Sequence, residues 1–597
     1  MTHREKLEKL RETMHASELD ALIIPSADPH MSEYLPEHWK IMAWLTGFTG
    51  SAGTVVITQD FAGVWTDSRY FIQAEEQLSG SGFSLVKLVI PHTPEYIAWL
   101  AATLPEKSRI GYDGKTVSLS LSRKIDETAK YSHFIINENA DLISGLWKDR
   151  PPLPRTPVFL HDKKFTGISA AEKMEKIRHR MSQQKSDILI ISALDEIAWL
   201  FNIRASDIAY NPVVIAHAMI FHEEARLFVN PGQTDAETES HLNAEGIDIY
   251  PYEEWWDHLS SLPEGIRVWC PPLTTNILTY NILKQRYTVF EAPSPVAVDK
   301  AVKNPVEISN IRETMIHDGI ALERFFFWLE HHIGKERISE ISAAEKLESF
   351  RKKHPHYRGP GFSTISSFGK HGAIVHYIPS PESDIELKPE GIYLLDSGGQ
   401  YLSGTTDVTR TVATGTPDGQ QKDDFTRVLK GMISLAMLRF PEGTKGFQMD
   451  ILARRALWQT GLNYGHGTGH GVGYFLNVHE GPQSIGTGAS ESQNAAITPG
   501  MIVSDEPGIY RENEYGIRTE NLILCVPDTE TAFGRFYAFE TLTLCHIDRN
   551  LIKPELLSDE EKEWINRYHH RVYELLSPGL SPEEKTWLKN KTKPLIF

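Results

Sequence analysis

The most restrictive feature of the sequence is a short segment, residues 391–411, in which two aspartates stand in strand-like surroundings. Apolar and β-branched residues predict strands over residues 392–395 and 405–412, joined by a loop rich in glycine and serine. Asp396 ends the first of these strands, and Asp407 lies inside the second. A carboxylate in such a run loses part of its hydration, which is unfavourable unless a cation or hydrogen bonds compensate. An isolated pair of this kind is equally typical of a solvated hairpin, so the interpretation depends on residues further along the chain.

Further residues of metal-binding type occur in three places downstream. Residues 464–480 carry three histidines among glycines, which let the backbone approach a site closely. Glu506 stands in a Ser-Asp-Glu-Pro-Gly run, and Glu520 begins an apolar strand, an awkward position for a free carboxylate. Taken separately, the Gly/His segment is also typical of a flexible loop, and the acidic run of a surface turn.

Together these places supply four carboxylates and an imidazole. The carboxylates are Asp396, Asp407, Glu506 and Glu520. Carboxylate-rich sites favour Mn²⁺, Fe²⁺ or Co²⁺ and also accept Zn²⁺. A single catalytic zinc usually takes three protein ligands and a water. The larger set suits two ions that share bridging carboxylates and a bridging hydroxide nucleophile. The sequence therefore predicts a dinuclear metal centre.

Composition excludes several classes of function. The net charge is −18 over 597 residues, and no Lys/Arg run marks a basic patch, so we expect no nucleic-acid partner. Cys270, Cys525 and Cys545 lie far apart without Cys-x-x-Cys spacing, which fits a reducing compartment. No apolar stretch approaches the ~20 residues that span a bilayer. The chain opens with a charged amphipathic helix instead of a signal sequence. We therefore expect a cytoplasmic protein without membrane association.

A helix–strand unit occurs twice in the first half of the chain. Four apolar positions recur with an offset of 167 residues: Leu7, Leu10, Met14 and Leu22 correspond to Met174, Ile177, Met181 and Leu189. An Ala-Trp-Leu run then follows in each copy at an offset of 155, so the first copy has gained twelve residues near residues 29–40. A chance match of two common units is the alternative. We predict two homologous helix–strand domains in succession.

Proline-rich segments divide the chain. Residues 150–157 contain four prolines, and a second break falls at residues 292–295. Beyond it, Asn304 and Pro305 predict the start of a long helix. We expect domains at residues 1–155, 156–302 and 303–597, the last with a C-terminal helical extension from about residue 535. Two α/β domains thus precede an α+β domain that holds the strong motifs.

The ligand-type residues and several longer segments also carry a resemblance to a known family. Asp396, Asp407, His470, Glu506 and Glu520 stand in the order and local context of the pita-bread metallopeptidases. Further matching segments are residues 48–54, 65–71, 372–377, 396–401 and 539–543. Over nearly the whole chain, the sequence is most similar to the long, three-domain, cytosolic Xaa-Pro aminopeptidases. The resemblance implies two creatinase-N-like helix–strand domains followed by a pita-bread catalytic domain.

The resemblance implies a role for each ligand. Asp396 would hold one metal ion, and His470 and Glu506 the other. Asp407 and Glu520 would bridge the two ions.

It also implies roles towards the substrate. Glu506 would carry a proton from the bridging water to the leaving amine, and His479 would steady the scissile carbonyl oxygen as it becomes anionic. His376 would contact the substrate near the scissile bond, with a core histidine as the alternative. His466 would help to shape the pocket for the proline ring. Arg518 would orient the metal carboxylates and contribute to substrate binding.

The implied activity is removal of an N-terminal residue that precedes proline. The resemblance implies two divalent ions, foremost Mn²⁺ with Zn²⁺, Co²⁺ or Fe²⁺ as alternatives, and a homodimer. An X–Pro bond is a tertiary amide without an N–H, so the site must accept the ring and protonate a hindered nitrogen. The nearest alternative is prolidase, which uses the same centre on dipeptides but usually has one leading domain. A non-catalytic pita-bread binding protein or a creatinase-like enzyme would lack the ligands found here.

Overall fold

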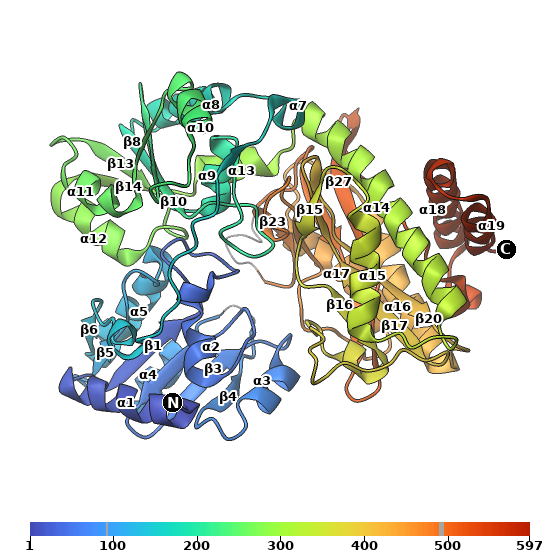
Figure 1. Ribbon diagram of the computed structural model, residues 1–597, viewed down its shortest axis with the longest axis horizontal. Coiled ribbons are helices and arrows are strands. Elements are labelled where there is room, and N and C mark those ends of the chain that lie inside the picture. Colours follow the sequence, from blue (N-terminus) through green and yellow to red (C-terminus); the bar gives the residue numbers. More distant parts are fainter. Residues whose placement is uncertain (91–92, 489–494, 597) are drawn as a thin grey trace. The chain divides into compact units, whose positions relative to one another are not determined.

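The computed structural model describes residues 1–90, 93–488 and 495–596, which divide into two compact units (Figure 1). The first unit comprises Met1–Asp162 with Ile168–Ala297, and the second Lys163–Gly167 with Val298–Phe597. Among the described residues, no helix combines the length and the apolar character needed to cross a membrane.

The first unit contains two six-stranded sheets of the same design. The first has the order β4-β3-β2-β1-β5-β6, and the second β12-β11-β10-β8-β13-β14. In each, the strand that follows the first helix (β1 or β8) pairs antiparallel with one neighbour and parallel with the other. The first sheet consists of β1 Ala21–Pro25, β2 Thr54–Thr58, β3 Ala62–Thr66, β4 Ser84–Lys87, β5 Arg109–Gly111 and β6 Ile135–Asn137. The second consists of β8 Ile188–Ile191, β10 Ala216–Phe221, β11 Ala225–Val229, β12 Ile247–Pro251, β13 Arg267–Cys270 and β14 Thr288–Glu291. The predicted repeat is therefore confirmed.

The two copies begin with equivalent helices, α1 His3–Ala16 and α8 Ala170–Gln183. Each starts with a capping box, Thr2 with Glu5 and Ser169 with Glu172, in which side chains and backbone N–H groups of the first turn satisfy one another. The apolar positions found in the sequence are the buried faces of these helices. The remaining helices of the unit are α2 Ile41–Thr46, α3 Phe71–Gln77, α4 Glu95–Thr103, α5 Leu119–Ser132, α6 Ile143–Leu146, α9 Leu194–Leu200, α10 Ala236–Ala244, α11 Trp255–Ser260 and α12 Ile277–Arg286.

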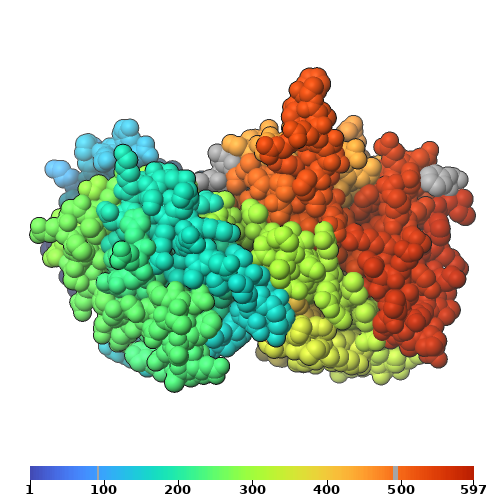
Figure 2. Space-filling view, turned by 90° about the horizontal axis from the view of Figure 1, so that it is seen from above, coloured from blue at the N-terminus to red at the C-terminus, as the bar shows by residue number. Residues whose placement is uncertain are grey.

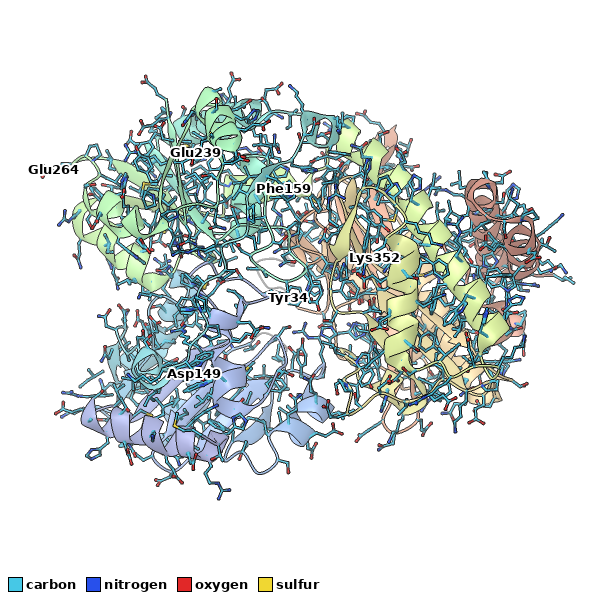
Figure 3. The ribbon with its side chains drawn as sticks, viewed as in Figure 1. Tyr34, Asp149, Phe159, Glu239, Glu264 and Lys352 are labelled. Carbon is cyan, nitrogen blue, oxygen red and sulfur yellow. The ribbon has the colours of Figure 1, made fainter. Side chains whose placement is uncertain are left out.

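Two helices lead into the sheets of the second unit. α13 Pro295–Ala301 is followed by α14 Pro305–His332, whose start is fixed by Asn304, because its side chain accepts hydrogen bonds from two backbone N–H groups of the first turn. This confirms the predicted helix start. α14 lies beside α15 Glu340–Arg351, whose C-cap Lys352 is labelled in Figure 3. A short helix, α7 Lys163–Thr166, belongs to the same unit.

The second unit is built on several small sheets and one large one. The three-stranded sheets have the orders β15-β18-β19 and β16-β17-β20, the large sheet β21-β28-β27-β24-β22-β23, and β25 and β26 form a hairpin. Their bounds are β15 Tyr357–Pro360, β16 Ile365–Phe368, β17 Ile392–Ser397, β18 Gly399–Tyr401, β19 Gly404–Thr405, β20 Val408–Ala413, β21 Arg439–Pro441, β22 Gly469–Gly471, β23 Glu480–Ile485, β24 Ile502–Asp505, β25 Gly508–Arg511, β26 Tyr515–Arg518, β27 Asn521–Thr531 and β28 Gly534–Thr541. The far ends of β27 and β28 are exposed and form the orange projection in Figure 2.

Helices α16 Gly419–Ala436 and α17 Gly446–Trp458 complete this domain, and the chain ends with α18 Asp559–Leu576 and α19 Pro582–Lys591. The helical extension predicted from about residue 535 begins later than expected, because residues 534–541 form β28 and α18 starts at Asp559. Leu576 of α18 and Leu588 of α19 are buried in the same hydrophobic cluster as Phe325 of α14 and Leu429 of α16. The C-terminal helices are therefore part of the core of the second unit.

The single strand predicted over residues 405–412 is wrong. β19 ends at Thr405 and β20 begins at Val408, and the two belong to different sheets. The chain changes sheets at Thr406, whose N–H donates to Gly399 O and whose side chain accepts from Gly399 N–H. Asp407 therefore lies between two ladders instead of within one, although its side chain remains buried.

Candidate metal centre

The two aspartates lie close together at one end of the β17–β20 ladder. Asp396, near the end of β17, is opposite Thr409 of β20, and Asp407 precedes β20. Both aspartates are buried, with 7% and 4% of their surface exposed. Two carboxylates are thus held near one another with little access to bulk water.

The other three predicted ligands come from neighbouring strands of the large sheet. His470 lies in β22, Glu506 follows β24, and Glu520 precedes β27, and these strands are adjacent in the order β27-β24-β22. The N–H of Glu520 donates to Thr409 O over 3.1 Å, which joins the large sheet to β20. The two sheets thus meet at the predicted ligands.

Side-chain distances bring four of the five predicted ligands together. The ligand atoms of Asp407, His470 and Glu520 all lie within 4.8 Å of one another. Nε2 of His470 is 3.5 Å from Oδ2 of Asp407 and 3.3 Å from Oε1 of Glu506. Asp396 is connected to this group through Arg518.

The ring of His470 is oriented as a metal ligand would be. Its Nδ1 lies 2.9 Å from Gly471 O, and its backbone N–H donates to Ser504 Oγ. With a proton on Nδ1, donated to that carbonyl, the Nε2 lone pair faces the carboxylates. Burial alone would lower the pKa of His470, but the hydrogen bond to Asp407 and the charge of Glu506 raise it to about 9. A cation at Nε2 would replace the proton that this environment favours.

Arg518, at the end of β26, ties Asp396 to the other ligands. Its Nη2 binds Asp396 Oδ2 at 2.6 Å, and its Nη1 donates to Tyr510 OH at 2.7 Å. Its Nε donates to Thr409 Oγ1, which in turn donates to Glu520 Oε2 at 2.7 Å. Arg518 is only 2% exposed. The prediction that it orients carboxylates fits this geometry, whereas its burial and its protein partners argue against the predicted contact with substrate.

Burial raises the pKa of several carboxyl groups in this cluster. For Asp396 burial is the largest cause, opposed by Arg518 and reinforced by Asp407, and the pKa is about 7. The pKa of Glu520 lies well above its ordinary value, because of burial and then the charges of Asp407, Asp396 and Glu506. Burial likewise raises the pKa of Glu506. Neighbouring buried carboxyl groups cannot all ionise easily, because their negative charges repel one another. A bound divalent cation would stabilise them as carboxylates.

The residues present fit the two predicted ions. Oδ1 of Asp396 is buried and has no hydrogen-bond partner among the described residues, as expected of an oxygen that faces a cation. The donor set of carboxylate oxygens and one imidazole nitrogen suits Mn²⁺, Fe²⁺ or Co²⁺. The ligands come from two sheets that are joined by the hydrogen bond from Glu520 N–H to Thr409 O, so the protein itself holds the ligands in place.

Two of the predicted substrate histidines lie beside this cluster. The ring of His479 packs edge-on against His470, with ring centroids 4.3 Å apart. Nε2 of His466 is 2.8 Å from Tyr510 OH, and Tyr510 also binds Arg518. A chain of hydrogen bonds thus runs from His466 through Tyr510 and Arg518 to Asp396.

His376 lies in the turn that follows the short helix η3 Gly369–Ala373 and is half-buried. This helix abuts β26, because Gly372 and Gly516 approach so closely that a Cβ on Gly516 would lie 1.7 Å from Gly372 O. His376 is therefore four residues from a contact with the strand that carries Arg518. This close approach accounts for a glycine at both positions.

Sequence reasoning missed several residues that support the site. Tyr510 had no distinguishing signal, because a lone tyrosine after Pro-Gly is common. Asp450 and Arg454 of α17 form a buried ion pair at 2.6 Å, and Arg454 donates to the carbonyls of Tyr464 and His466. Their i, i+4 spacing was a detectable signal, although such pairs usually lie on exposed helix faces.

Comparison with known proteins agrees with this organisation. Residues 6–137 and 149–307 match models of the creatinase/prolidase N-terminal domain, residues 309–527 match metallopeptidase family M24, and residues 535–595 match its C-terminal region. A probable Xaa-Pro aminopeptidase P of Laccaria bicolor is 41% identical and covers 99% of this chain and 93% of its own. Human Xaa-Pro aminopeptidase 2 is 40% identical, covering 99% of this chain and 88% of its own.

A solved structure shares the whole fold. The X-prolyl aminopeptidase of Caenorhabditis elegans, described as a cytosolic enzyme with a di-nuclear active site, superposes with a TM-score of 0.94 at 34% identity and full coverage of both chains. The fold is that of two creatinase-type N-terminal domains followed by a pita-bread domain. With its ligand cluster and its full-length relatives, the chain belongs to the Xaa-Pro aminopeptidases of metallopeptidase family M24.

Proposed function

We propose that the protein hydrolyses the bond between the N-terminal residue of a peptide and a following proline, using a dinuclear metal centre. The observation that carries this proposal is the convergence of Asp407, His470, Glu506 and Glu520 at the meeting of two sheets. The names of the full-length relatives and the di-nuclear site described for the Caenorhabditis elegans enzyme support it.

The ligands divide between two positions. Asp396 would hold one ion, His470 and Glu506 would hold the other, and Asp407 and Glu520 would be ligands of both. When bound, the ions would polarise the scissile carbonyl as Lewis acids and would lower the pKa of the attacking water. We propose Mn²⁺ as the native metal, because the donor set is rich in carboxylates and contains no thiolate.

Glu506 moves the proton. Its side chain is 18% exposed, the most accessible of the four carboxylates, and its Oε1 accepts a hydrogen bond from Ser504 Oγ. It therefore takes the proton released by the nucleophile and delivers it to the proline nitrogen, which leaves as a secondary amine. This delivery is needed because the tertiary amide has no N–H and its nitrogen is a poor leaving group unprotonated.

The histidines act on the substrate. His479 donates to the carbonyl oxygen as negative charge develops there. His376 contacts the substrate near the scissile bond. His466, held by Tyr510, forms part of the wall of the proline pocket.

Substrate length separates this proposal from prolidase. A dipeptidase needs a cation to bind the free carboxylate beside the proline ring, but residues 464–480 contain no Lys or Arg, and Arg518 is occupied by Asp396 and Tyr510. We expect cleavage of X-Pro-Y tripeptides and longer X-Pro peptides, little cleavage when alanine replaces proline, and dipeptides no better than tripeptides. Product release is measured by chromatography after chelation and after reconstitution with Mn²⁺, Co²⁺ or Zn²⁺.

Chelation should abolish this hydrolysis, and Mn²⁺ should restore it best. Hydrolysis by a preparation that elemental analysis shows to be free of metal would refute the mechanism. Efficient cleavage of X-Pro dipeptides with no turnover of X-Pro-Y would assign the enzyme to prolidases instead.

Removal of the His479 side chain tests its role separately from the metal. His479→Ala should retain two ions per chain, while kcat/KM falls by roughly 10²–10³-fold, the scale of one lost transition-state donor. Metal content and steady-state kinetics are measured on the same preparation. Loss of metal in proportion to activity would make His479 a ligand.

We further propose a homodimer that uses α17. Phe447, Ile451 and Trp458 are 37%, 52% and 46% exposed on this helix, and Met437 at the end of α16 is 39% exposed. An exposed row of large apolar side chains is typical of a surface covered by a partner. Ile451→Glu should yield monomers by light scattering while the exposed Glu512→Gln leaves the dimer intact. A monomeric wild-type chain would contradict the proposal.

We also propose three domains and a cytoplasmic location for the protein. The division into residues 1–155, 156–302 and 303–597 is supported by the two repeated sheets and by the extents of the family matches. A cytoplasmic location is supported by the cytosolic description of the Caenorhabditis elegans enzyme and by three cysteines that are buried and free.

A further inference from the structure

A buried cluster of charges lies outside the metal ligands. The two carboxylate oxygens of Glu480 bind different lysines, Oε2 to Nζ of Lys300 at 2.6 Å and Oε1 to Nζ of Lys303. All three side chains are at most 2% exposed. Burying charged groups carries a high desolvation cost, and removing one partner of such a cluster leaves a poorly compensated charge in the interior.

Glu480 stands next to the residues proposed to act on the substrate. It directly follows His479 and is the first residue of β23. In the ladder with β22 it is opposite Gly471, at a register shift beside the metal ligand His470. The ring of His479 packs on the ring of His470. The orientation of Glu480 therefore determines where the backbone of His479 enters the site.

The lysines are themselves held by rigid elements. Lys300 lies in α13, and Lys303 immediately precedes Asn304, the N-cap of α14. The backbone N–H of Lys303 donates to Gly500 O at 2.9 Å, and its Nζ also reaches the carbonyl oxygens of Lys300 and Ala301. One ammonium group is thus carried by α13, and the other by the residue that precedes the N-cap of the 28-residue helix α14.

The other side of the histidine loop is fixed independently. Nε2 of Gln400 donates to Leu476 O at 2.7 Å, and Thr405 Oγ1 joins Gln400 Oε1 to Leu476 N–H. The loop that carries His479 is therefore held at Leu476 by β18 and β19, and at Glu480 by the two lysines. Removal of one lysine weakens the attachment at Glu480 and leaves the attachment at Leu476 intact.

We propose that Lys300 and Lys303 are positioning residues for the reaction, which act through Glu480 to hold His479 against the developing oxyanion. This inference rests on the proposed role of His479. Loss of one lysine leaves a buried carboxylate with half of its partners, so Glu480 reorients or is neutralised and His479 shifts with it. Because His479 acts on the charge that develops during reaction, the loss falls on kcat more than on KM.

The experiment is a double-mutant cycle with Lys303→Met and His479→Ala. Lys303→Met should lower kcat by roughly 10- to 100-fold, the scale of a misplaced catalytic group, with KM changed by less than about threefold and two ions retained. In the His479→Ala background, Lys303→Met should add no further loss of kcat, since the residue it positions is absent. Glu480→Gln, which keeps the size of the side chain, should behave like Lys303→Met and replaces it in the cycle if Lys303→Met does not fold.

Lys173→Met provides the matched control. Lys173 is 1% exposed and donates to Trp199 O and Asn202 Oδ1 in the first unit. Its replacement should lower the melting temperature while leaving kcat unchanged, which separates loss of a buried lysine from loss of this cluster.

Four results would overturn the inference. Fully additive losses in the cycle would show that the lysines act independently of His479. Loss of metal by Lys303→Met would show that they support the ligands instead. Unchanged kcat in both Lys303→Met and Glu480→Gln would show that the cluster is only structural. Near-normal activity of His479→Ala alone would refute the proposed role of that histidine and, with it, this inference. The single variant distinguishes this outcome from the other three.

Discussion

Asp407→Ala is expected to release both metal ions and to reduce peptide hydrolysis below detection. The Asp407 carboxylate faces His470 Nε2 at 3.5 Å and shares a 4.8 Å cluster with Glu520, so both proposed ion positions depend on it. Its removal also leaves the imidazole with one fewer anionic neighbour, which weakens the positioning of the remaining ligands. Metal per chain is measured by elemental analysis after dialysis, and activity by release of X from an X-Pro-Y tripeptide.

Two further variants make the result specific. Asp396→Ala should lose one ion and retain the other, because Asp396 is assigned to a single position. Asp318→Ala removes a carboxylate that is equally buried but pairs with Arg351, so it should lower stability while both ions stay bound. Retention of two ions by Asp407→Ala would contradict the assignment of this residue as a bridge.

The repeated domains could be predicted because their determinants are local. Helix starts depend on a few adjacent residues, and the capping boxes at Thr2 and Ser169 stand 167 positions apart, as do the apolar positions that follow them. The helix–strand order of each copy can therefore be predicted from about 25 consecutive residues. The order of the strands in each sheet could not be predicted from local patterns, because it depends on which strands pair across long connections.

The break at Asp407 shows where local patterns fail. A run of threonines and valines favours a strand whatever its partners are, so nothing in residues 405–412 marks the change of sheet. The break follows from pairing with β18 on one side and β17 on the other. The carboxylate of Asp407 within a strand-like run was nevertheless informative, because it correctly indicated an unusual buried site.

The types and order of the candidate ligands could be predicted, whereas their supporting residues could not. Glu480 and Lys303 are 177 positions apart, and Arg518 and Asp396 are separated by 122. None of these pairs has a sequence spacing that links its members. Arg518 shows the limit most clearly, because the resemblance implied two roles for it and its burial favours only the role of orienting a carboxylate, that of Asp396.

The most highly connected of these supporting residues is Arg410 of β20. It is buried, and its donors reach six acceptors at 2.6–3.0 Å. The acceptors are the carbonyl oxygens of Thr409, Glu520, Cys545 and His546, Oδ1 of Asn521 and the hydroxyl of Tyr568. These lie on β20, at the start of β27, in the segment after β28 and on α18. A single side chain thus joins the backbone of one proposed bridging ligand to the C-terminal region.

Arg410→Met is expected to lower the free energy of unfolding of the second unit by about 3–5 kcal/mol. The variant keeps most of the apolar volume but leaves several buried carbonyl groups without donors, and each unsatisfied group costs about 1–3 kcal/mol before relaxation. Hydrogen exchange read by mass spectrometry measures the effect, with peptides from β20 and β27 as reporters. Peptides from β8 in the first unit serve as an internal control, because two units need not unfold together.

Tyr568→Phe distinguishes the network from a simple packing role. It removes one hydroxyl that Arg410 shares with Cys545 O, so it should destabilise by about 1 kcal/mol, far less than Arg410→Met. If Arg410 supports Glu520 as its contacts indicate, Arg410→Met should also weaken metal retention, whereas Tyr568→Phe should not. Equal exchange rates at β20 in Arg410→Met and the wild type would show that the carbonyl groups find other partners. The contacts between the C-terminal region and the proposed metal ligands would then make no measurable contribution to stability.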